Sequence, residues 1–185
     1  MNPLRLAVIG AGRLGGFHAQ KAAAREDLAL VGVADPVEEQ RRRVAAACGC
    51  RAAADYHDLI GEIDAAVVAA PTSLHHQIGM ELLAGGVHVL MEKPLAPKAR
   101  DAQELADAAA ANRLILQVGH VERFNPAFTA SRAHFAEAKY IDAVRASGFT
   151  FRSTDVGVVL DLMIHDIDLV LSMVRSPARR VDAVG

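Results

Sequence analysis

Short continuous apolar runs alternate with segments of helical composition over the first 120 residues of the chain. Such runs predict strands that are buried on both faces, because a strand with one face in water would alternate apolar and polar residues. The expected strands are residues 4–9, 28–34, 65–70, 87–91 and 114–118. The expected helices are residues 13–24, 37–47, 73–84 and 98–111. The alternation predicts an α/β fold with a doubly wound parallel sheet, in a first domain at residues 1–120.

The pattern changes after residue 120. A helix is expected at 125–138, a strand at 142–150 and a strongly apolar helix at 158–174, and residues 180–184 look like the start of a further strand. These elements indicate the beginning of an α+β substrate domain over residues 121–185, which we expect to be truncated because one or two strands cannot cover the apolar helix. The helix should then expose an apolar face, and association into a homo-oligomer through this domain is expected.

A glycine-rich segment follows the first expected strand. Residues 10–15 read G-A-G-R-L-G, which matches the G-x-G-x-x-G pattern of dinucleotide-binding turns. Gly10 would permit the tight turn, Gly12 would let the backbone approach a pyrophosphate, and Gly15 would let the next helix pack on the strand. The phosphates would lie at the N-terminus of that helix. The residues expected to contact the cofactor here are Gly10, Ala11, Gly12, Arg13, Leu14 and Gly15.

The second expected strand ends in an acidic residue. Asp35 follows Gly15 by 20 positions, where a carboxylate accepts hydrogen bonds from an adenosine ribose. NAD is therefore expected rather than NADP, whose phosphate would be repelled by this carboxylate. Two alternatives remain open at this point: Asp35 and Pro36 can form a turn that only caps the next helix, and the arginines at 41–43, which we expect to lie on a solvated helix face, can soften the preference for NAD.

Composition narrows the class of protein. The 185 residues are 52% hydrophobic and carry a formal net charge of −2, which argues against a nucleic-acid or anionic-membrane partner. The apolar runs are too short to span a membrane or to form a signal peptide, so a cytoplasmic protein with a small-molecule partner is expected. Cys48 and Cys50 have no second pair and no histidine cluster near them, so we expect reduced thiols and no metal site.

Two further groups of residues can carry chemistry. Glu92, Lys93 and Pro94 follow the strand at 87–91, and ligands of parallel sheets bind at the carboxyl ends of the strands. Lys93 could exchange a proton with a substrate hydroxyl and Glu92 could hold a cofactor ribose, although a solvated exit from the strand would have the same composition.

The second group is a polar stripe on the apolar helix at 158–174. Its members are spaced so that they share one helix face. Alternatively, these groups bond to each other or to neighbouring backbone. The stripe comprises Asp161, His165, Asp168 and Ser172.

Together these motifs resemble the Gfo/Idh/MocA superfamily of oxidoreductases. The resemblance rests on residues 10–15, Ala70-Pro71-Thr72, Glu92-Lys93-Pro94 and the Asp161-x-x-x-His165 spacing. It implies a Rossmann domain that holds NAD(P), with Pro71, Thr72, Glu92 and Lys93 among the cofactor contacts. It also implies that Lys93, Asp161 and His165 are the catalytic residues.

A finer resemblance lies in residues 119–126, which read G-H-V-E-R-F-N-P. This segment is similar to that of the branch that oxidises UDP-N-acetylglucosamine at its 3-hydroxyl, although it also reads as an interdomain turn with a proline-started helix. The implied substrate contacts are Lys93, His120, Arg123, Asn125, Asp161 and His165.

The expected reaction is hydride transfer from a secondary carbinol to nicotinamide while a base removes the hydroxyl proton. Lys93 and His165 are both candidates for the base, and Asp161 would orient them or balance their charge. Two alternatives stay open: the substrate is inositol or another free sugar, or the chain is a dinucleotide-binding module without catalysis.

Overall fold

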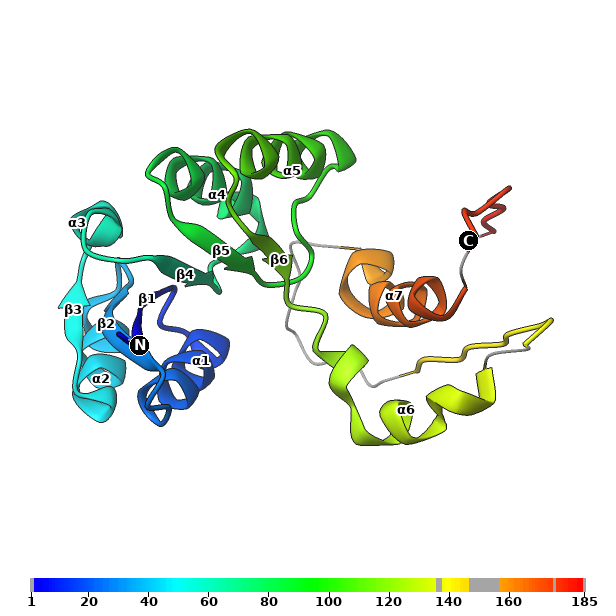
Figure 1. Cartoon of the computed structure of the whole chain (residues 1–185), viewed down its shortest axis with the longest axis horizontal. Helices are drawn as coiled ribbons and strands as arrows, with labels where there is room; N and C mark the ends of the chain where they lie inside the picture. The colour runs from blue at the N-terminus through cyan, green and yellow to red at the C-terminus, as the bar shows by residue number, and fades with distance from the viewer. Residues whose placement is uncertain (1, 136–137, 147–156, 175, 185) are drawn as a thin grey trace. The chain divides into compact units, whose positions relative to one another are not determined.

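The computed structural model describes residues 2–135, 138–146, 157–174 and 176–184 (Figure 1). The chain divides into two compact units, residues 1–119 and residues 120–185, and each is described by itself.

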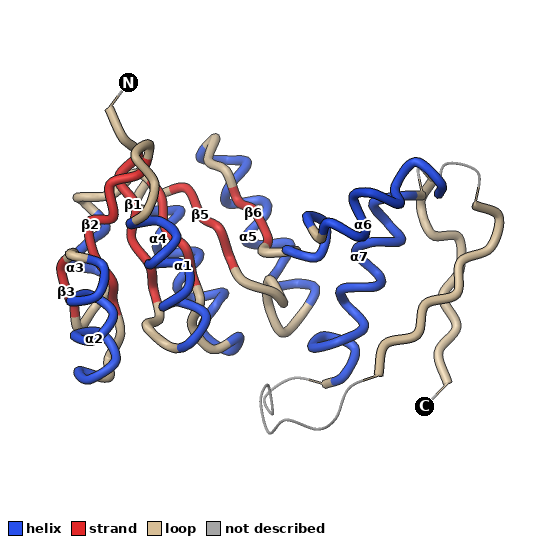
Figure 2. Tube along the Cα trace, turned by 90° about the horizontal axis from the view of Figure 1, so that it is seen from below, coloured by secondary structure: helices blue, strands red, loops and turns tan. Residues whose placement is uncertain are grey.

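The first unit is built on a six-stranded parallel sheet with the order β3-β2-β1-β4-β5-β6. Figure 2 shows these strands running side by side with helices around them. The chain starts in the middle of the sheet, builds one half outward, and returns to build the other half beside β1. The order therefore reverses between β1 and β4, which is where open α/β sheets bind ligands. The strands are β1 (Leu4–Ile9), β2 (Leu28–Ala34), β3 (Arg51–Ala53), β4 (Ala65–Val68), β5 (His88–Met91) and β6 (Leu116–Val118).

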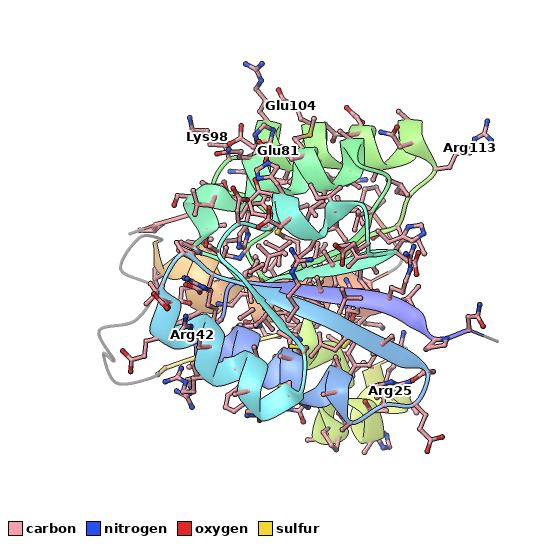
Figure 3. The ribbon with its side chains drawn as sticks, turned by 90° about the vertical axis from the view of Figure 1, so that its left-hand side faces the viewer. Arg25, Arg42, Glu81, Lys98, Glu104 and Arg113 are labelled. Carbon is pink, nitrogen blue, oxygen red and sulfur yellow. The ribbon has the colours of Figure 1, made fainter. Side chains whose placement is uncertain are left out.

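Helices cover both faces of this sheet, as the doubly wound fold requires. Helices α1 (Arg13–Ala23) and α2 (Glu38–Cys48) bury Ala19 and Val44 against one face. Helices α3 (His57–Ile60), α4 (His75–Ala84) and α5 (Ala99–Asn112) bury Leu59, Leu82 and Leu105 against the other. Figure 3 shows Arg42 of α2 on the first side and Glu81 and Glu104 of α4 and α5 on the opposite side. The predicted fold class is confirmed.

The element boundaries follow the apolar runs closely. β1 and β2 begin and end where predicted. β4 ends two residues early, because the chain turns at Pro71 into a 3₁₀ turn, η1 (Thr72–Leu74). The sequence reasoning missed β3 and α3. β3 has only three residues, and its Arg51 and Ala52 are exposed, so its position at the edge of the sheet leaves no apolar run to detect.

The second unit is helical where the structure describes it. It contains the 3₁₀ turn η2 (Val121–Phe124), helix α6 (Pro126–Ser131), the 3₁₀ turn η3 (Arg132–Phe135), a π-helical turn η4 (Val159–Met163) and helix α7 (Ile164–Met173). Asn125 begins α6, because its side-chain oxygen accepts the N–H of Ala127 at 3.0 Å and Pro126 occupies the first turn.

One helix prediction for this unit was correct only in part, and two strand predictions were wrong over the residues that the structure describes. The helix expected at 125–138 passes into a 3₁₀ turn at Arg132 and is not helical at Ala138, while 136–137 lie outside the described residues. Residues 142–146 form no strand, and 147–150 lie outside the described residues; residues 180–184 form none either. A strand needs a neighbour to complete its backbone hydrogen bonds, and the described part of this unit offers none.

The long apolar helix is present in a modified form. It is interrupted at its start by the π-helical turn η4, in which the chain winds with more residues per turn than an α-helix. Its expected exposed face is present: Val159, Met163, Ile167 and Leu171, four residues apart in sequence, are all exposed. In the part of the chain that is described, no helix combines the length and the apolar character needed to cross a membrane.

Candidate functional site

The glycine-rich turn after β1 has the close packing that its sequence predicts. Gly10 adopts a φ of 95°, and a Cβ there would lie 2.6 Å from the carbonyl oxygen of Ala69. A Cβ on Gly15 would lie 1.8 Å from the carbonyl oxygen of Gly10. Gly12 differs, because the nearest atom to a Cβ there is the Gln40 side-chain oxygen at 4.0 Å. Gly10 and Gly15 are therefore required by packing, whereas the space beside Gly12 is open.

Helix α1 begins directly after this turn. Its N-cap is Gly12, which supplies no side-chain cap to the first turn. The first N–H groups of a helix lack partners within the helix, and they carry the positive end of its dipole. A glycine N-cap leaves room for an anion to take the place of a capping side chain.

Asp35 joins the turn to the end of β2. Its side chain is buried, and its two oxygens accept the backbone N–H groups of Ala11 at 2.7 Å and Val37 at 2.8 Å. The carboxylate therefore does cap the following turn, which was the alternative interpretation of this residue. A carboxylate oxygen can accept more than one hydrogen bond, so this cap leaves acceptor capacity toward the cavity that Asp35 lines.

The arginines of α2 are not equivalent. Arg41 donates to the backbone oxygens of Asp35 at 3.3 Å and Pro36 at 3.0 Å, and its side chain is only 16% exposed. Arg42 pairs with Glu38 at 2.7 Å on the surface. The prediction of a solvated face was wrong for Arg41, because the carbonyl groups of the Asp35 turn hold its guanidinium.

A cavity of about 690 Å³ lies where the strand order reverses. This volume is within the range of small-molecule and cofactor sites, about 300–1,000 Å³. Its walls are the glycine turn, the Asp35 turn, the segment after β3 and the segment after β4. The lining includes Gly10, Gly12, Asp35, Pro71 and Gln77.

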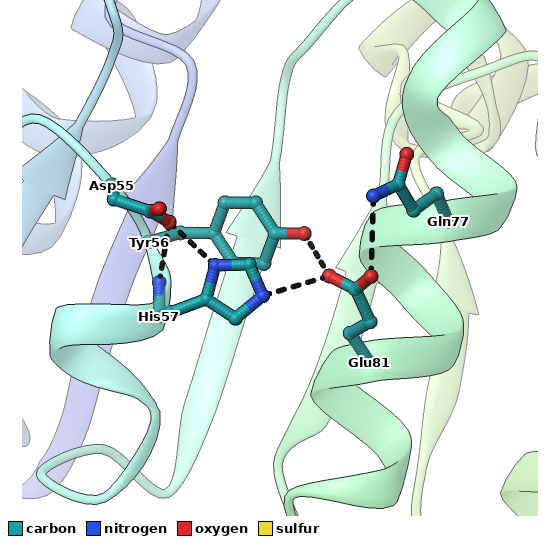
Figure 4. A network of polar contacts seen from close by, with 5 residues as sticks. All are labelled: Asp55, Tyr56, His57, Gln77 and Glu81. Carbon is teal, nitrogen blue, oxygen red and sulfur yellow. Dashed lines mark hydrogen bonds and ion pairs between the residues drawn. The ribbon is translucent and has the colours of Figure 1, made fainter.

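One wall of this cavity includes Asp55, Tyr56, His57 and Gln77, which form a polar network with Glu81 (Figure 4). His57 contacts Asp55 at 2.6 Å and Glu81 at 3.0 Å, and Gln77 donates to Glu81 at 3.2 Å. The Tyr56 hydroxyl donates to the same Glu81 carboxylate. The hydrogen bond to Asp55 raises the pKa of His57 above its ordinary value, and burial together with Glu81 raises the pKa of Tyr56. The network connects the segment after β3 to α4, and the sequence reasoning missed it because it missed β3.

The carboxyl end of β5 carries the expected Glu-Lys-Pro segment. Glu92 is buried, and its carboxylate contacts His18 of α1 at 2.6 Å and accepts the N–H of Lys93 at 3.3 Å. The peptide bond between Lys93 and Pro94 is cis. The contact from His18 was not predicted, because the two side chains are 74 positions apart.

Another buried histidine joins the two segments that follow β4 and β5. The ring nitrogens of His75 lie 2.9 Å from the backbone oxygens of Ala70 and Pro94. Thr72 is also buried in this region, and Pro71 lines the cavity. His75 thus fixes the Ala-Pro-Thr turn against the Glu-Lys-Pro turn, a role that its sequence context did not indicate.

The second unit holds the remaining predicted residues. Asp161 lies in η4 and His165 in α7. Asp168 is buried, and its carboxylate accepts hydrogen bonds from two of the three guanidinium nitrogens of Arg123, at 2.7 and 2.5 Å. The His120 ring lies 3.7 Å from the same carboxylate. The structural interpretation of the polar stripe therefore holds for Asp168.

It also holds for Ser172, whose hydroxyl donates to the Leu169 carbonyl at 2.7 Å. Asn125, predicted to contact substrate, uses its side chain to cap α6 and to donate to Glu122 at 3.1 Å. The structure thus brings the glycine turn, Asp35 and Pro71 together in the first unit, and it joins Arg123 and His120 to Asp168 in the second.

Among the described residues, no group of three or more His, Cys, Asp or Glu side chains is arranged to hold a metal ion. Cys48 and Cys50 are free thiols, as predicted. Burial raises the pKa of Cys50 to about 11.

Comparison with known proteins gives a consistent result. Residues 4–120 match the model of the GFO_IDH_MocA oxidoreductase family, described as an NAD-binding Rossmann fold. The chain is 41% identical over 183 residues to UDP-N-acetylglucosamine 3-dehydrogenase of Acidithiobacillus ferrooxidans, covering 98% of this chain and 58% of the relative. It is 30% identical to the rhizopine catabolism protein MocA of Rhizobium meliloti, covering 91% and 56%.

Solved structures agree. The Acidithiobacillus ferrooxidans enzyme superposes with a TM-score of 0.86 over 94% of this chain and 57% of that one. GenD2 from gentamicin A biosynthesis, in complex with NAD, superposes with a TM-score of 0.84 at 28% identity, over 96% of this chain and 55% of that one. The chain therefore spans a little over half the length of the relatives it matches.

Proposed function

The chain belongs to the Gfo/Idh/MocA family of oxidoreductases, and we propose that it works as an NAD-dependent dehydrogenase that transfers a hydride between a secondary hydroxyl of a sugar or nucleotide sugar and nicotinamide. We assign cofactor binding to residues 1–120, and substrate binding and association into a homo-oligomer to residues 121–185.

The observation that carries this proposal is the open space beside Gly12, next to a buried carboxylate and in the cavity at the strand reversal. A dinucleotide fits this donor set: the N-terminus of α1 suits a pyrophosphate, and Asp35 suits a ribose diol. A 2′-phosphate would face the Asp35 carboxylate. Arg41 on α2 already donates hydrogen bonds to the backbone carbonyl groups of that turn. Because this holds its guanidinium away from a 2′-phosphate, NAD is favoured over NADP.

We assign cofactor contacts to the predicted residues around this cavity. Asp35 would accept the ribose hydroxyls, and Pro71 and Thr72 would border the cofactor from the segment after β4. Glu92 and Lys93 would approach it from the end of β5. The glycine-turn contacts are Gly10, Ala11, Gly12, Arg13, Leu14 and Gly15.

Three side chains would take part in removing the proton from the substrate, either as the base or by orienting the base. Bound NAD supplies the hydride acceptor. Lys93 or His165 would take the proton from the substrate hydroxyl, and Asp161 would orient the base or balance its charge. His120, Arg123 and Asn125 would contact the substrate.

UDP-N-acetylglucosamine, oxidised at its 3-hydroxyl, is the substrate we favour. The similarity to the dehydrogenase of that nucleotide sugar, 41%, exceeds the 28–30% found for inositol dehydrogenases of Bacillus subtilis and Saccharopolyspora erythraea over similar lengths. Arg123 offers a cation to a diphosphate, because 48% of its side chain stays exposed while it binds Asp168.

The test begins with titration of the protein with NAD and with NADP, followed by addition of UDP-N-acetylglucosamine or myo-inositol while the absorbance of reduced nicotinamide is recorded. NAD binding with NADH formation supports the proposal, and the substrate that gives turnover identifies the class. Binding without turnover on any sugar would favour a non-catalytic module. In an active protein, Lys93→Ala should lower kcat by roughly 10²- to 10⁴-fold and leave NAD affinity largely unchanged; unchanged turnover would exclude Lys93 from the mechanism.

Association is tested separately, by sedimentation analysis. The exposed apolar residues Met163, at the end of η4, and Ile167 and Leu171, on α7, support it. Replacement of Ile167 and Leu171 by Ser should shift the protein toward the monomer, and a wild-type protein that is monomeric at all concentrations would contradict it.

A further inference from the structure

A partly buried contact between His18 and Glu92 connects the cofactor-binding helix to the strand end that carries Lys93. His18 lies in the second turn of α1, and its Nε2 is 2.6 Å from the Oε1 of Glu92 at the carboxyl end of β5. The two side chains are 23% and 9% exposed. Since α1 begins at Gly12, the pair links the pyrophosphate turn to the Glu-Lys-Pro segment through two side chains.

Glu92 has little freedom to move. Its backbone N–H donates to the Val68 carbonyl at 2.9 Å, which fixes it to β4. On the other side, a Cβ built on Gly119 would lie 3.0–3.2 Å from three carboxylate atoms of Glu92, so the carboxylate packs directly against the backbone after β6. The remaining carboxylate oxygen accepts the N–H of Lys93. The carboxylate therefore contacts both the His18 ring and the first backbone group of Lys93.

A buried carboxylate is costly without a hydrogen-bonding partner, and His18 is the side chain that supplies one here. Without it, Glu92 would have to reorient toward water or lose its charge, and either change would alter the acceptor that holds the Lys93 N–H. The pair lies away from the α4–α5 packing, where a similar contact, His76 with Glu104 at 2.9 Å, joins two helices.

We propose that His18 is a positioning residue for the dehydrogenase reaction: by holding the Glu92 carboxylate, it sets the orientation of Lys93 relative to the cofactor turn. This inference rests on the proposed function of Lys93. It differs from a purely structural role in requiring that His18 act on the chemical step.

Three substitutions of His18 test this. His18→Ala removes the donor, and His18→Asn keeps a polar amide that is too short to reach Glu92. His18→Gln keeps an N–H donor at nearly the original reach. His76→Ala is the matched control, because it breaks a histidine–glutamate pair of the same unit that does not line the cavity.

We expect His18→Ala and His18→Asn to lower kcat by about 10- to 100-fold, the size of effect that a small misplacement of a reacting group produces, with less than a threefold change in the substrate KM. His18→Gln should recover most of kcat, and His76→Ala should match the wild type. If His18→Ala fails to fold, the kcat of His18→Asn is compared with that of the wild type and of His18→Gln instead. An unchanged kcat in the folded variants, or a loss that His18→Gln does not recover, would overturn the inference.

A second readout separates this inference from the proposed function. The rate at which the Lys93 amine is acylated by acetic anhydride, followed by mass spectrometry of the Lys93 peptide, needs no turnover. We expect at least a threefold change of this rate in His18→Ala and His18→Asn, and wild-type rates in His18→Gln and His76→Ala. A wild-type protein inactive on every sugar defeats the proposed function alone, whereas equal acylation rates in all variants defeat the positioning role.

Discussion

Adding one methyl group at Gly12 or at Gly15 should produce opposite defects, although the two residues are three positions apart. In Gly12→Ala the new Cβ has no neighbour closer than 4.0 Å, and the residue's φ of −67° suits alanine. The fold should therefore be retained while the methyl group occupies the approach to the pyrophosphate. In Gly15→Ala the Cβ would lie 1.8 Å from the Gly10 carbonyl oxygen, so the fold itself is affected.

The magnitudes follow from these distances. Gly12→Ala removes backbone freedom from the unfolded chain, which is worth about 0.4–1 kcal/mol of stabilisation. Alanine is a poorer N-cap than glycine by a similar amount, so the two effects offset each other and Tm should change by no more than about 4 °C. NAD affinity should fall by about 10- to 100-fold, or roughly 1.4–2.8 kcal/mol. Gly15→Ala must open a 1.8 Å contact to at least 3.0 Å, a movement of about 1.2 Å between α1 and the turn. Overpacking of this size costs about 3 kcal/mol, or roughly 6–12 °C in Tm.

The assay is thermal unfolding of each variant together with calorimetric titration of NAD. Gly61→Ala is the control, because nothing lies within 4 Å of its Cβ, its φ is −74°, and it is outside the cavity lining. It should keep wild-type NAD affinity and change Tm by no more than about 4 °C. Wild-type affinity in Gly12→Ala would refute the close approach of a pyrophosphate to this turn. Wild-type Tm in Gly15→Ala would refute the packing of α1 on Gly10.

Three further predictions concern individual groups. Asp35→Ala should lower NAD affinity at least tenfold and abolish the preference over NADP in parallel titrations, since it removes the ribose acceptor; a retained preference would contradict this. Cys50, whose pKa burial raises to about 11, should be alkylated far more slowly at pH 8 in the native protein than after unfolding, as mass spectrometry would show. Hydrogen bonds from Arg5 lower the pKa of Asp64 from 3.8 to about 2. The pair therefore stabilises the fold above about pH 4, and its contribution is lost as pH falls through the folded-state pKa. In acid unfolding experiments the stability difference between wild type and Arg5→Ala should shrink over this interval, and a difference at pH 2 as large as that above about pH 4 would contradict the pairing.

The sequence predicted the first unit well for a local reason. Buried parallel strands such as β1 and β2 are continuously apolar, so the ends of each apolar run in the sequence mark the ends of the strand. The glycine turn and Asp35 could also be recognised from the sequence. The glycine pattern and the number of residues from it to the acidic residue are both read along one βαβ segment of the chain. β3 was missed because its exposed, three-residue segment at the edge of the sheet carries no such signal.

The second unit was predicted less well because the structure of its segments depends on partners that the local sequence pattern does not reveal. Residues 142–146 have the composition of a strand, but a strand forms only against a partner, and the described residues of that unit provide none. The polar stripe along η4 and α7 was recognised by its spacing, yet the role of Asp168 depends on Arg123, which lies 45 positions earlier.

The sequence by itself determined the doubly wound sheet, the dinucleotide turn and the acidic residue beside it, because periodicity and turn chemistry act over a few neighbouring residues. Only the tertiary structure decided which side chains meet across the sheet. The contact of His18 with Glu92 and the network that joins Tyr56 and His57 to Glu81 both bridge elements distant in sequence. The physical reason is that strand order, not sequence distance, brings these groups within hydrogen-bonding range. Burial then makes the Glu92 carboxylate depend on the partner that it contacts there.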